Sequence, residues 1–188
     1  MSEQTSDQPT LVIINGPPAS GKTTLARLLC AQMHLALHLD VDEIRDMVSN
    51  WEADKQASGL FARCLARSMA TCHLSNRRSV VVSQLFGRHD DLDQLNELAQ
   101  RCQANYIEVV IRVPRDTALE RFVERGGPKF DTLRGDRPDS IVSEFDVLFN
   151  RIALDTSLRD GVVTIDSLEG DVPGTLKTLV EAIEIESA

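Results

Sequence analysis

Short continuous apolar runs alternate along this chain with longer segments whose apolar residues recur at helical spacing. Continuous apolar runs are typical of strands covered on both faces, and apolar positions three or four apart are typical of helices. The pattern predicts strands at 10–15, 35–39, 79–84, 105–113 and 161–167. It predicts helices at 21–33, 41–76 with a break near Ser58-Gly59, 90–102, 115–126, 139–154 and 171–183.

This alternation predicts an α/β domain with a parallel sheet. The 188 residues suit one domain, and we expect it to span 10–188 behind a disordered polar tail at 1–9. Ligands of such sheets bind outside the carboxyl ends of the strands. The strand ends to inspect are Asn15-Gly16, Asp40, Ser83-Gln84, Val113-Pro114 and Asp166-Ser167.

Composition narrows the class of protein. Hydrophobic residues make up 42% and charged residues 26% of the chain, as in soluble globular proteins. The apolar runs are far shorter than the roughly 18 residues that span a bilayer, and the polar start of the chain is unlike a signal peptide. We therefore expect a cytoplasmic protein without a membrane partner.

The net charge and the cysteines indicate which partners and cofactors are not expected. The net charge of −9 argues against a long nucleic-acid partner, because phosphate neutralisation by basic residues drives such binding. The four cysteines form no CxxC pair, so a zinc or redox motif is not indicated. We interpret them as reduced and mostly buried small hydrophobic residues.

A complete GxxxxGK[ST] motif follows the first predicted strand, from Gly16 to Thr23. Its glycines allow the backbone N–H groups to curl around an anion, at the positive end of the following helix. Lys22 is placed to reach the β and γ phosphates, and the Thr23 hydroxyl is placed to bind Mg²⁺. The predicted ATP-binding residues of this loop are Gly16, Ala19, Ser20, Gly21, Lys22, Thr23 and Thr24, with Lys22 also catalytic.

The stretch "LDVDEIR" at 39–45 allows two interpretations. Asp40 and Glu43 fit a capping box, and Asp42 in the first helical turn suits the helix dipole. Alternatively, the two aspartates have separate chemical roles beside the phosphate loop. The interpretations differ most in where the side chains of Asp42 and Arg45 point.

Asp40 is the acid that ends the second strand, whereas the third strand ends in "VVVSQ" without an acid. With the phosphate loop and the arginine-bearing segment at 125–137, this arrangement resembles the small P-loop kinases. That group includes nucleoside monophosphate kinases, shikimate kinase, gluconate kinase, chloramphenicol phosphotransferase, and the kinase domains of polynucleotide kinases and zeta toxins. The resemblance implies a three-layer fold, a five-stranded parallel sheet in the order 2-3-1-4-5, a small mobile lid at about 125–138, and ATP with Mg²⁺ as cofactors.

The resemblance also implies roles for single residues. Asp40-Val41-Asp42 is similar to the Asp-x-Asp of shikimate kinase, where the first acid supports the Mg²⁺ shell through water and the second accepts the proton of the substrate hydroxyl. Asp42 and Arg45 are equally similar to the Asp-x-x-Arg of polynucleotide kinases and zeta toxins, where the arginine touches the acceptor. Shikimate kinase has a glycine-rich turn after the third strand, but here Ser83-Gln84-Leu85 follows, which argues against shikimate as substrate.

Arginines gather around the segment expected to form the lid. Residues 112–137 hold seven basic and five acidic residues, within a chain that is strongly acidic overall. Arg121 and Arg125 lie one helical turn apart and are the expected lid arginines that bind ATP and stabilise the transferred phosphoryl group. The expected acceptor-binding residues are Asp42, Arg45, Ser83, Gln84, Arg88 and Arg137.

These features favour an ATP- and Mg²⁺-dependent phosphotransferase acting on a hydroxyl of a small molecule. A polynucleotide 5′-kinase or a zeta toxin-like nucleotide-sugar kinase is the first alternative. A nucleotide-binding regulatory ATPase without a small acceptor is the second, although no NKxD guanine-reading motif is present. The sequence leaves both a monomer and a homodimer open.

Overall fold

The computed structural model describes residues 8–87, 89–124, 138–156, 160–167 and 170–186. The strands are β1 (Thr10–Asn15), β2 (Leu37–Leu39), β3 (Val80–Ser83), β4 (Asn105–Arg112) and β5 (Val163–Asp166). The α-helices are α1 (Lys22–Gln32), α2 (Val41–Asp46), α3 (Lys55–Ser75), α4 (His89–Arg101), α5 (Arg115–Glu124), α6 (Pro138–Thr156) and α7 (Val172–Glu186). A 3₁₀ helix, η1 (Trp51–Asp54), precedes α3.

The five strands form one parallel sheet in the order β2-β3-β1-β4-β5. Both the parallel sheet and its strand order are therefore confirmed. β1 lies at the centre, and all six of its residues are buried, which explains why its sequence is a continuous apolar run rather than an alternating one. The carboxyl ends of β1, β2 and β3 carry the phosphate loop, Asp40 and Ser83-Gln84, and adjacent strands place these segments side by side.

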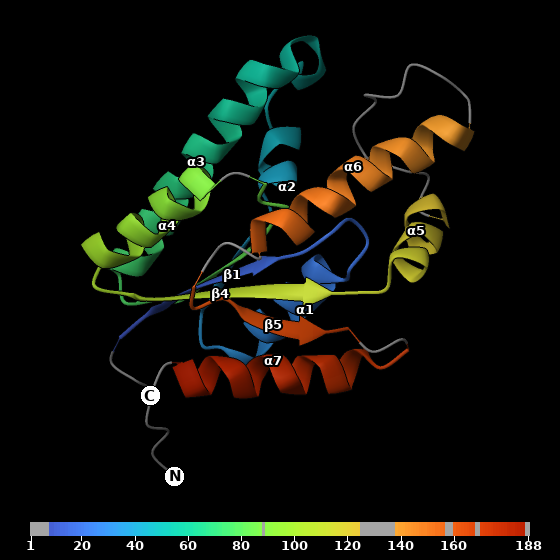
Figure 1. Ribbon diagram of the computed structural model, residues 1–188. Helices are drawn as coiled ribbons and strands as arrows, with labels where there is room; N and C mark the ends of the chain where they lie inside the picture. Colours follow the sequence, from blue (N-terminus) through green and yellow to red (C-terminus); the bar gives the residue numbers. More distant parts are fainter. Residues whose placement is uncertain (1–7, 88, 125–137, 157–159, 168–169, 187–188) are drawn as a thin grey trace.

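Helices cover both faces of the sheet and make the three layers (Figure 1). α1 and α7 pack on one face, where the core includes Val12, Ile14 and Leu179. α3 and α4 pack on the other face around Leu11, Ile13 and Leu98. α6 crosses over this second face (Figure 1). Among the described residues, no helix is both long enough and apolar enough to cross a membrane.

The helical segment after β2 breaks at a different place from the one predicted. We expected a break near Ser58-Gly59, but α2 ends at Asp46 and α3 runs without interruption through both residues. Asp54 starts α3, because its side chain accepts a hydrogen bond from the N–H of Ala57 at 2.9 Å. The Ser58 hydroxyl donates to the carbonyl of Trp51 at 3.0 Å. Ser58 therefore stabilises the junction between η1 and α3 instead of ending a helix.

The cysteines also differ from the expectation. All four are free, but Cys64 and Cys72 lie exposed on α3, while Cys30 and Cys102 are only partly buried. The interpretation of mostly buried cysteines was wrong because helical spacing alone does not say which face of α3 meets the core. The buried residues on that face are mostly small, among them Ala62, Ala66 and Ala70.

Candidate active site

The phosphate loop joins β1 to α1 in a conformation that requires glycine. Gly16 has a φ of 151°, and a Cβ atom there would lie 2.7 Å from the carbonyl oxygen of Ile111 and 2.9 Å from the Ser20 Oγ. Gly21 has a φ of 93° in the left-handed region, which favours glycine. The spacing of the motif is therefore matched by a backbone that bends tightly at both glycines.

The N-terminus of α1 is left available for an anion. Its N-cap residue, Gly21, offers no side chain to the first N–H groups, and the first turn holds no acidic residue. Helix α2 is the opposite case, because Asp40 caps it and both Asp42 and Glu43 lie in its first turn. N–H groups without a side-chain cap, together with an uncompensated positive helix end, are the features that bind phosphate.

Lys22 and Ser20 direct further donors at this loop. The Lys22 Nζ donates to the carbonyl of Pro17 at 2.7 Å, so its side chain folds back over the loop. The Ser20 hydroxyl is fully buried and has no hydrogen-bond partner within the described part of the chain. A buried hydroxyl without a partner is unfavourable. Both groups therefore fit a loop that is completed by a ligand.

The side chains of Thr23 and Asp40 contact each other between the phosphate loop and the end of β2. The Thr23 hydroxyl donates to the Asp40 Oδ2 at 3.4 Å, and the Oδ1 of the same carboxylate accepts from the N–H of Asp42 at 3.0 Å. Asp40 therefore caps α2 and faces the phosphate loop at the same time. No group of three or more His, Cys, Asp and Glu side chains that could hold a metal is found in the described ranges. A hydroxyl with one carboxylate suits Mg²⁺ that is shared with nucleotide phosphates.

Asp42 and Arg45 form the second half of this site. They make an i,i+3 ion pair at 3.6 Å, with the Asp42 side chain 33% exposed and the Arg45 side chain 12% exposed. The guanidinium of Arg45 lies 4.4 Å from the ring centre of Trp51, in a cation–π contact. Gln84, at the end of β3, hydrogen-bonds the Asp42 carboxylate. Neither Asp42 nor Arg45 is a fully solvated surface residue.

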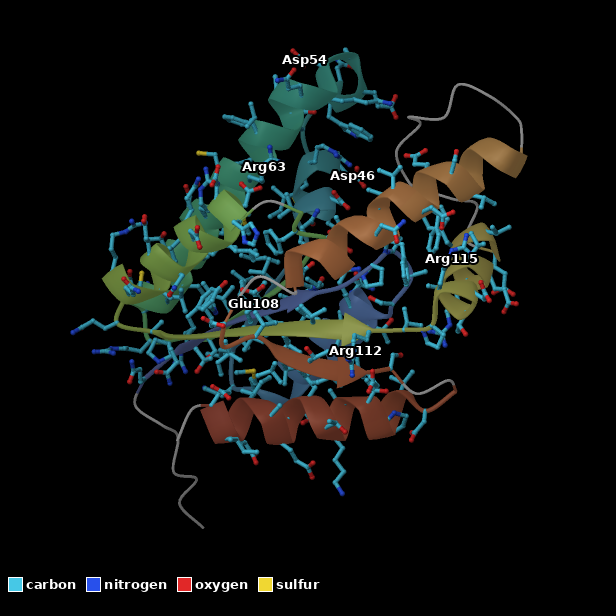
Figure 2. The ribbon with its side chains drawn as sticks, in the orientation of Figure 1. Asp46, Asp54, Arg63, Glu108, Arg112 and Arg115 are labelled. Atoms are coloured by element: carbon cyan, nitrogen blue, oxygen red, sulfur yellow. The ribbon has the colours of Figure 1, made fainter. Side chains whose placement is uncertain are left out.

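Partial burial raises the pKa of the Asp42 carboxyl above its usual value. The first cause is desolvation, and the charges of Asp40 and Asp46 add to it, while Arg45 and the hydrogen bond from Gln84 act in the opposite direction. Asp46 is labelled on α2 in Figure 2. A carboxylate with a raised pKa is a better proton acceptor than a solvated one.

Glu43 has a structural role. Its carboxylate pairs with Arg27 of α1, and the pair is exposed, so it contributes little to stability. The capping-box interpretation is therefore half confirmed. Asp40 is the N-cap, but Glu43 links α2 to α1.

Comparison with known proteins is consistent with this geometry. A family model described as an AAA domain (AAA_33) matches residues 11–145, from β1 into α6. The chain belongs to this family. The AAA domain of this chain is a P-loop kinase domain. The predicted resemblance to the small P-loop kinases is therefore confirmed.

Its relatives include kinases with different acceptors. The L-seryl-tRNA(Sec) kinase of Methanococcus maripaludis is 27% identical over 120 residues, which are 62% of this chain and 46% of that protein. This chain therefore spans about half the length of that relative. A shikimate kinase from Bacteroides thetaiotaomicron has a TM-score of 0.64 at 16% identity, over 93% of this chain and 98% of that one. A gluconokinase from Sinorhizobium meliloti 1021 has a TM-score of 0.58 at 18% identity, over 96% and 98%.

In this AAA domain, the side chain of Ser83 contacts His38. Side chains along β3 alternate, and Ser83 shares the α1 side of the sheet with Val81. There the Ser83 Oγ lies 2.8 Å from the His38 Nε2, and burial lowers the pKa of His38. Of the two adjacent residues expected to bind the acceptor, Gln84 contacts Asp42, and Ser83 is buried against His38.

The helices on either side of the predicted lid pack together and against the phosphate loop. Phe122 of α5 and Phe145 of α6 lie 5.3 Å apart between ring centres, and Ala19 of the loop packs on the same cluster. Arg115, labelled in Figure 2, joins the two helices through Asp146 at 2.7 Å. Arg121 is partly exposed in the last turn of α5. The other predicted arginines, Arg88, Arg125 and Arg137, lie outside the described residues, as does most of the segment 125–138.

Asn15 is a residue that the sequence interpretation did not assign to the site. It is the last residue of β1 and is 3% exposed. Its Oδ1 accepts from the N–H of Gly16 at 2.8 Å and of Phe86 at 3.0 Å, and its Nδ2 donates to the Phe86 carbonyl at 3.2 Å. One buried amide therefore joins the start of the phosphate loop to the segment after β3. The available signal was a polar residue at the end of the central apolar strand.

Replacing Asn15 with alanine is expected to loosen both segments. The substitution leaves three buried backbone groups without partners, so we expect a loss of about 1–3 kcal/mol in the free energy of unfolding. Nucleotide affinity should fall as well, because the start of the loop is no longer fixed. Urea unfolding and ATP titration measure the two effects. Asn76→Ala is the matched control, since Asn76 is exposed and bonds only within α3. Unchanged nucleotide affinity in Asn15→Ala would show that Asn15 does not position the loop.

Proposed function

We propose that this chain is an ATP- and Mg²⁺-dependent phosphotransferase that moves the γ-phosphoryl group to a hydroxyl of a small acceptor bound beside Asp42. The observation that carries the proposal is the hydrogen bond from the Thr23 hydroxyl to Asp40. It joins the phosphate loop directly to the residue that starts the helix of Asp42. A phosphate-binding loop and a candidate base are thus held at one edge of the sheet.

The phosphate loop binds the nucleotide in this proposal. N–H groups at the start of α1, from Gly21 to Thr24, receive the phosphate oxygens. The Lys22 ammonium exchanges the Pro17 carbonyl for the β and γ phosphates, where its charge offsets the negative charge of the transferred group. The tight backbone of the loop and the helix end without a side-chain cap support this role.

Thr23 and Asp40 would hold the magnesium, Thr23 by its hydroxyl and Asp40 through a water molecule. When bound, Mg²⁺ neutralises charge on the phosphate oxygens. The carboxylate that caps α2 is fixed by the N–H of Asp42, so it can order a water without first losing its side-chain freedom.

Asp42 orients the acceptor and takes its proton. As the acceptor oxygen bonds to the γ-phosphorus and the bond to ADP breaks, the hydroxyl proton passes to the Asp42 carboxylate. Gln84 and Arg45 hold that carboxylate in place, and Arg45 extends the site towards the acceptor. Arg121 and Arg125 are the proposed sources of positive charge from the lid.

A hydroxyl carried by RNA is the second candidate acceptor. It is favoured by the relative named L-seryl-tRNA(Sec) kinase. We prefer a small molecule because the chain carries a net charge of −9, which opposes a long phosphate backbone. This chain also covers nearly the whole of the two small-molecule kinases.

The test is a measurement of ADP release with a panel of sugars, sugar acids, cyclitols, nucleosides and aminoglycosides, and with seryl-tRNA as a separate arm. We expect Mg²⁺-dependent ADP release above the rate without acceptor for at least one small molecule, with the phosphorylated product seen by mass spectrometry. Chelation of Mg²⁺ should abolish it. Turnover with seryl-tRNA and with none of the small molecules would assign the RNA acceptor instead. Nucleotide binding without transfer in any arm would contradict a kinase function.

A further inference from the structure

A small cavity lies on the α3 side of the sheet, lined in part by residues next in sequence to those of the proposed acceptor site. Its apolar walls include Leu39, Val82 and Phe86, and its polar lining consists of Arg63, Arg67 and Asp91. The two arginines come from α3, where Figure 2 labels Arg63, and Asp91 comes from α4. The cavity is open to solvent and has a volume of about 20 Å³.

The chain connects this cavity to the proposed reaction centre. Leu39 and Val41 line it and directly flank Asp40, and Asp42 follows Val41. Val82 lies two residues before Gln84, which contacts Asp42. The backbone of Phe86 is held by Asn15 at the start of the phosphate loop. The cavity is therefore lined by residues that adjoin, along the chain, those of the proposed acceptor site.

The two arginines are arranged to receive an anion. Arg63 and Arg67 are one helical turn apart, so their side chains lie on one face of α3, where like charges repel each other. Both are only partly buried. Within the described residues, neither guanidinium makes an ion pair or a side-chain hydrogen bond. This is unusual in a chain that has 29 acidic residues for 20 basic ones.

Asp91 does not neutralise the pair. It lies in the first turn of α4, where the helix dipole stabilises its charge, and no ion pair links it to either arginine in the described ranges. The three side chains together leave an excess of one positive charge around an apolar floor. That combination fits a ligand with a carbon skeleton and one negative group.

We propose that Arg63 and Arg67 bind the carboxylate of the acceptor, which makes the acceptor a small hydroxy acid. This inference rests on the proposed function and specifies the class of its substrate. A volume near 20 Å³ corresponds to one or two water molecules, so the cavity takes a group of carboxylate size and not a whole sugar. The planar guanidinium matches a carboxylate with two parallel hydrogen bonds.

The first experiment measures binding directly. The Nε–Hε signals of Arg63 and Arg67 are followed by NMR, in the presence of ADP and Mg²⁺, during titration with gluconate and glycerate. The neutral partners glucitol and glycerol are titrated in parallel. Loss of one signal in Arg63→Gln and of another in Arg67→Gln assigns the two peaks. A saturable shift with an acid and none with its neutral partner supports the proposal, whereas no saturable shift, or equal shifts with both, overturns it.

The second experiment measures turnover with the same matched pairs. We expect the acid to have a kcat/KM at least about 10-fold above its neutral partner, and each Arg→Gln variant to raise KM for the acid about 10- to 100-fold. The kcat value and the KM for ATP should stay within a few-fold. Arg67→Lys should recover part of the loss. Arg101→Gln on α4 is the control, because that arginine is exposed and has only a weak contact with Glu97 at 3.8 Å.

The outcomes separate this inference from the proposed function. Phosphorylation of a neutral compound, unaffected by either Arg→Gln variant, leaves the kinase proposal standing and overturns the carboxylate site. Phosphorylation of seryl-tRNA alone also overturns it. ADP binding that does not depend on Lys22 contradicts the kinase proposal itself, whatever the arginine variants do. Circular dichroism of each variant shows that a change in KM does not come from unfolding.

Discussion

Asp42→Asn is expected to lower kcat by about 10²- to 10⁴-fold. Asparagine keeps the shape of the side chain and an oxygen that can accept a hydrogen bond from Gln84, but it loses the charge that pairs with Arg45 and cannot accept the acceptor's proton. The KM for ATP should stay within a few-fold, because the proposed nucleotide site is the phosphate loop on the other side of Asp40. Steady-state ADP release with an identified acceptor measures both values. Full activity in Asp42→Asn would show that Asp42 only lies near the acceptor.

The same substitution should stabilise the fold at neutral pH. Because burial raises the pKa of Asp42 in the folded state, the charged carboxylate is disfavoured by folding, and that penalty is fully present above the folded pKa. It disappears as pH falls below the ordinary carboxyl pKa, where both states are protonated. Asp42→Asn should therefore melt at a higher temperature than the natural chain at pH 7, and the difference should shrink towards pH 4, near the ordinary value of 3.8. Thermal unfolding at both pH values measures this.

Asp46→Asn is the matched control for this prediction. Asp46 is an exposed acid on the same short helix, so its substitution changes the net charge equally without removing a partly buried carboxylate. A similar rise in melting temperature for both variants would assign the effect to the acidic charge around α2 and not to the burial of Asp42. Lower stability of Asp42→Asn would mean that the pair with Arg45 outweighs the cost of burying Asp42.

The strands, the phosphate loop and the N-cap of α2 could be predicted from the sequence. Strand boundaries followed from apolar runs, and the phosphate loop followed from glycine and lysine spacing, because both depend on local chain properties. The strand order came from the resemblance to P-loop kinases. The N-cap role of Asp40 was also predictable, since an acid before a helical pattern has one dominant geometry.

The remaining features depend on contacts between distant segments. Ser83 faces His38 because β3 places it on the α1 side, and sequence alone does not give the face of a strand that is apolar throughout. Asn15 contacts a segment 71 residues away. Arg63 and Arg67 have the spacing of an ordinary solvated helix face, and only the packing of α3 against the sheet shows that they line a cavity.

The contact between Thr23 and Asp40 joins the phosphate loop to the start of α2. The residue that would hold the metal water also fixes the first turn of α2, through the N–H of Asp42. We therefore expect the binding of a nucleotide with Mg²⁺ at Thr23 to affect the position of Asp42. In the proposed mechanism, the nucleotide side and the acceptor side therefore share one carboxylate.

Lys22→Ala is expected to reduce kcat/KM by at least about 10²-fold, the usual loss when one preorganised donor to a developing charge is removed. Because the ammonium is proposed to contact the β and γ phosphates, the variant should bind ATP and ADP more weakly and bind AMP as before. The folded chain loses the hydrogen bond to Pro17, worth about 1 kcal/mol, and a thermal unfolding curve of the variant separates any loss of stability from weaker ATP binding. Lys177→Ala on α7 is the control, because that lysine is 79% exposed and has only a 3.8 Å contact with Glu181. Calorimetric titration with the three nucleotides measures their affinities for the variant and for the natural chain. A uniform loss of affinity for all three would place Lys22 away from the terminal phosphates, and unchanged affinity for all would remove the phosphate loop from nucleotide binding.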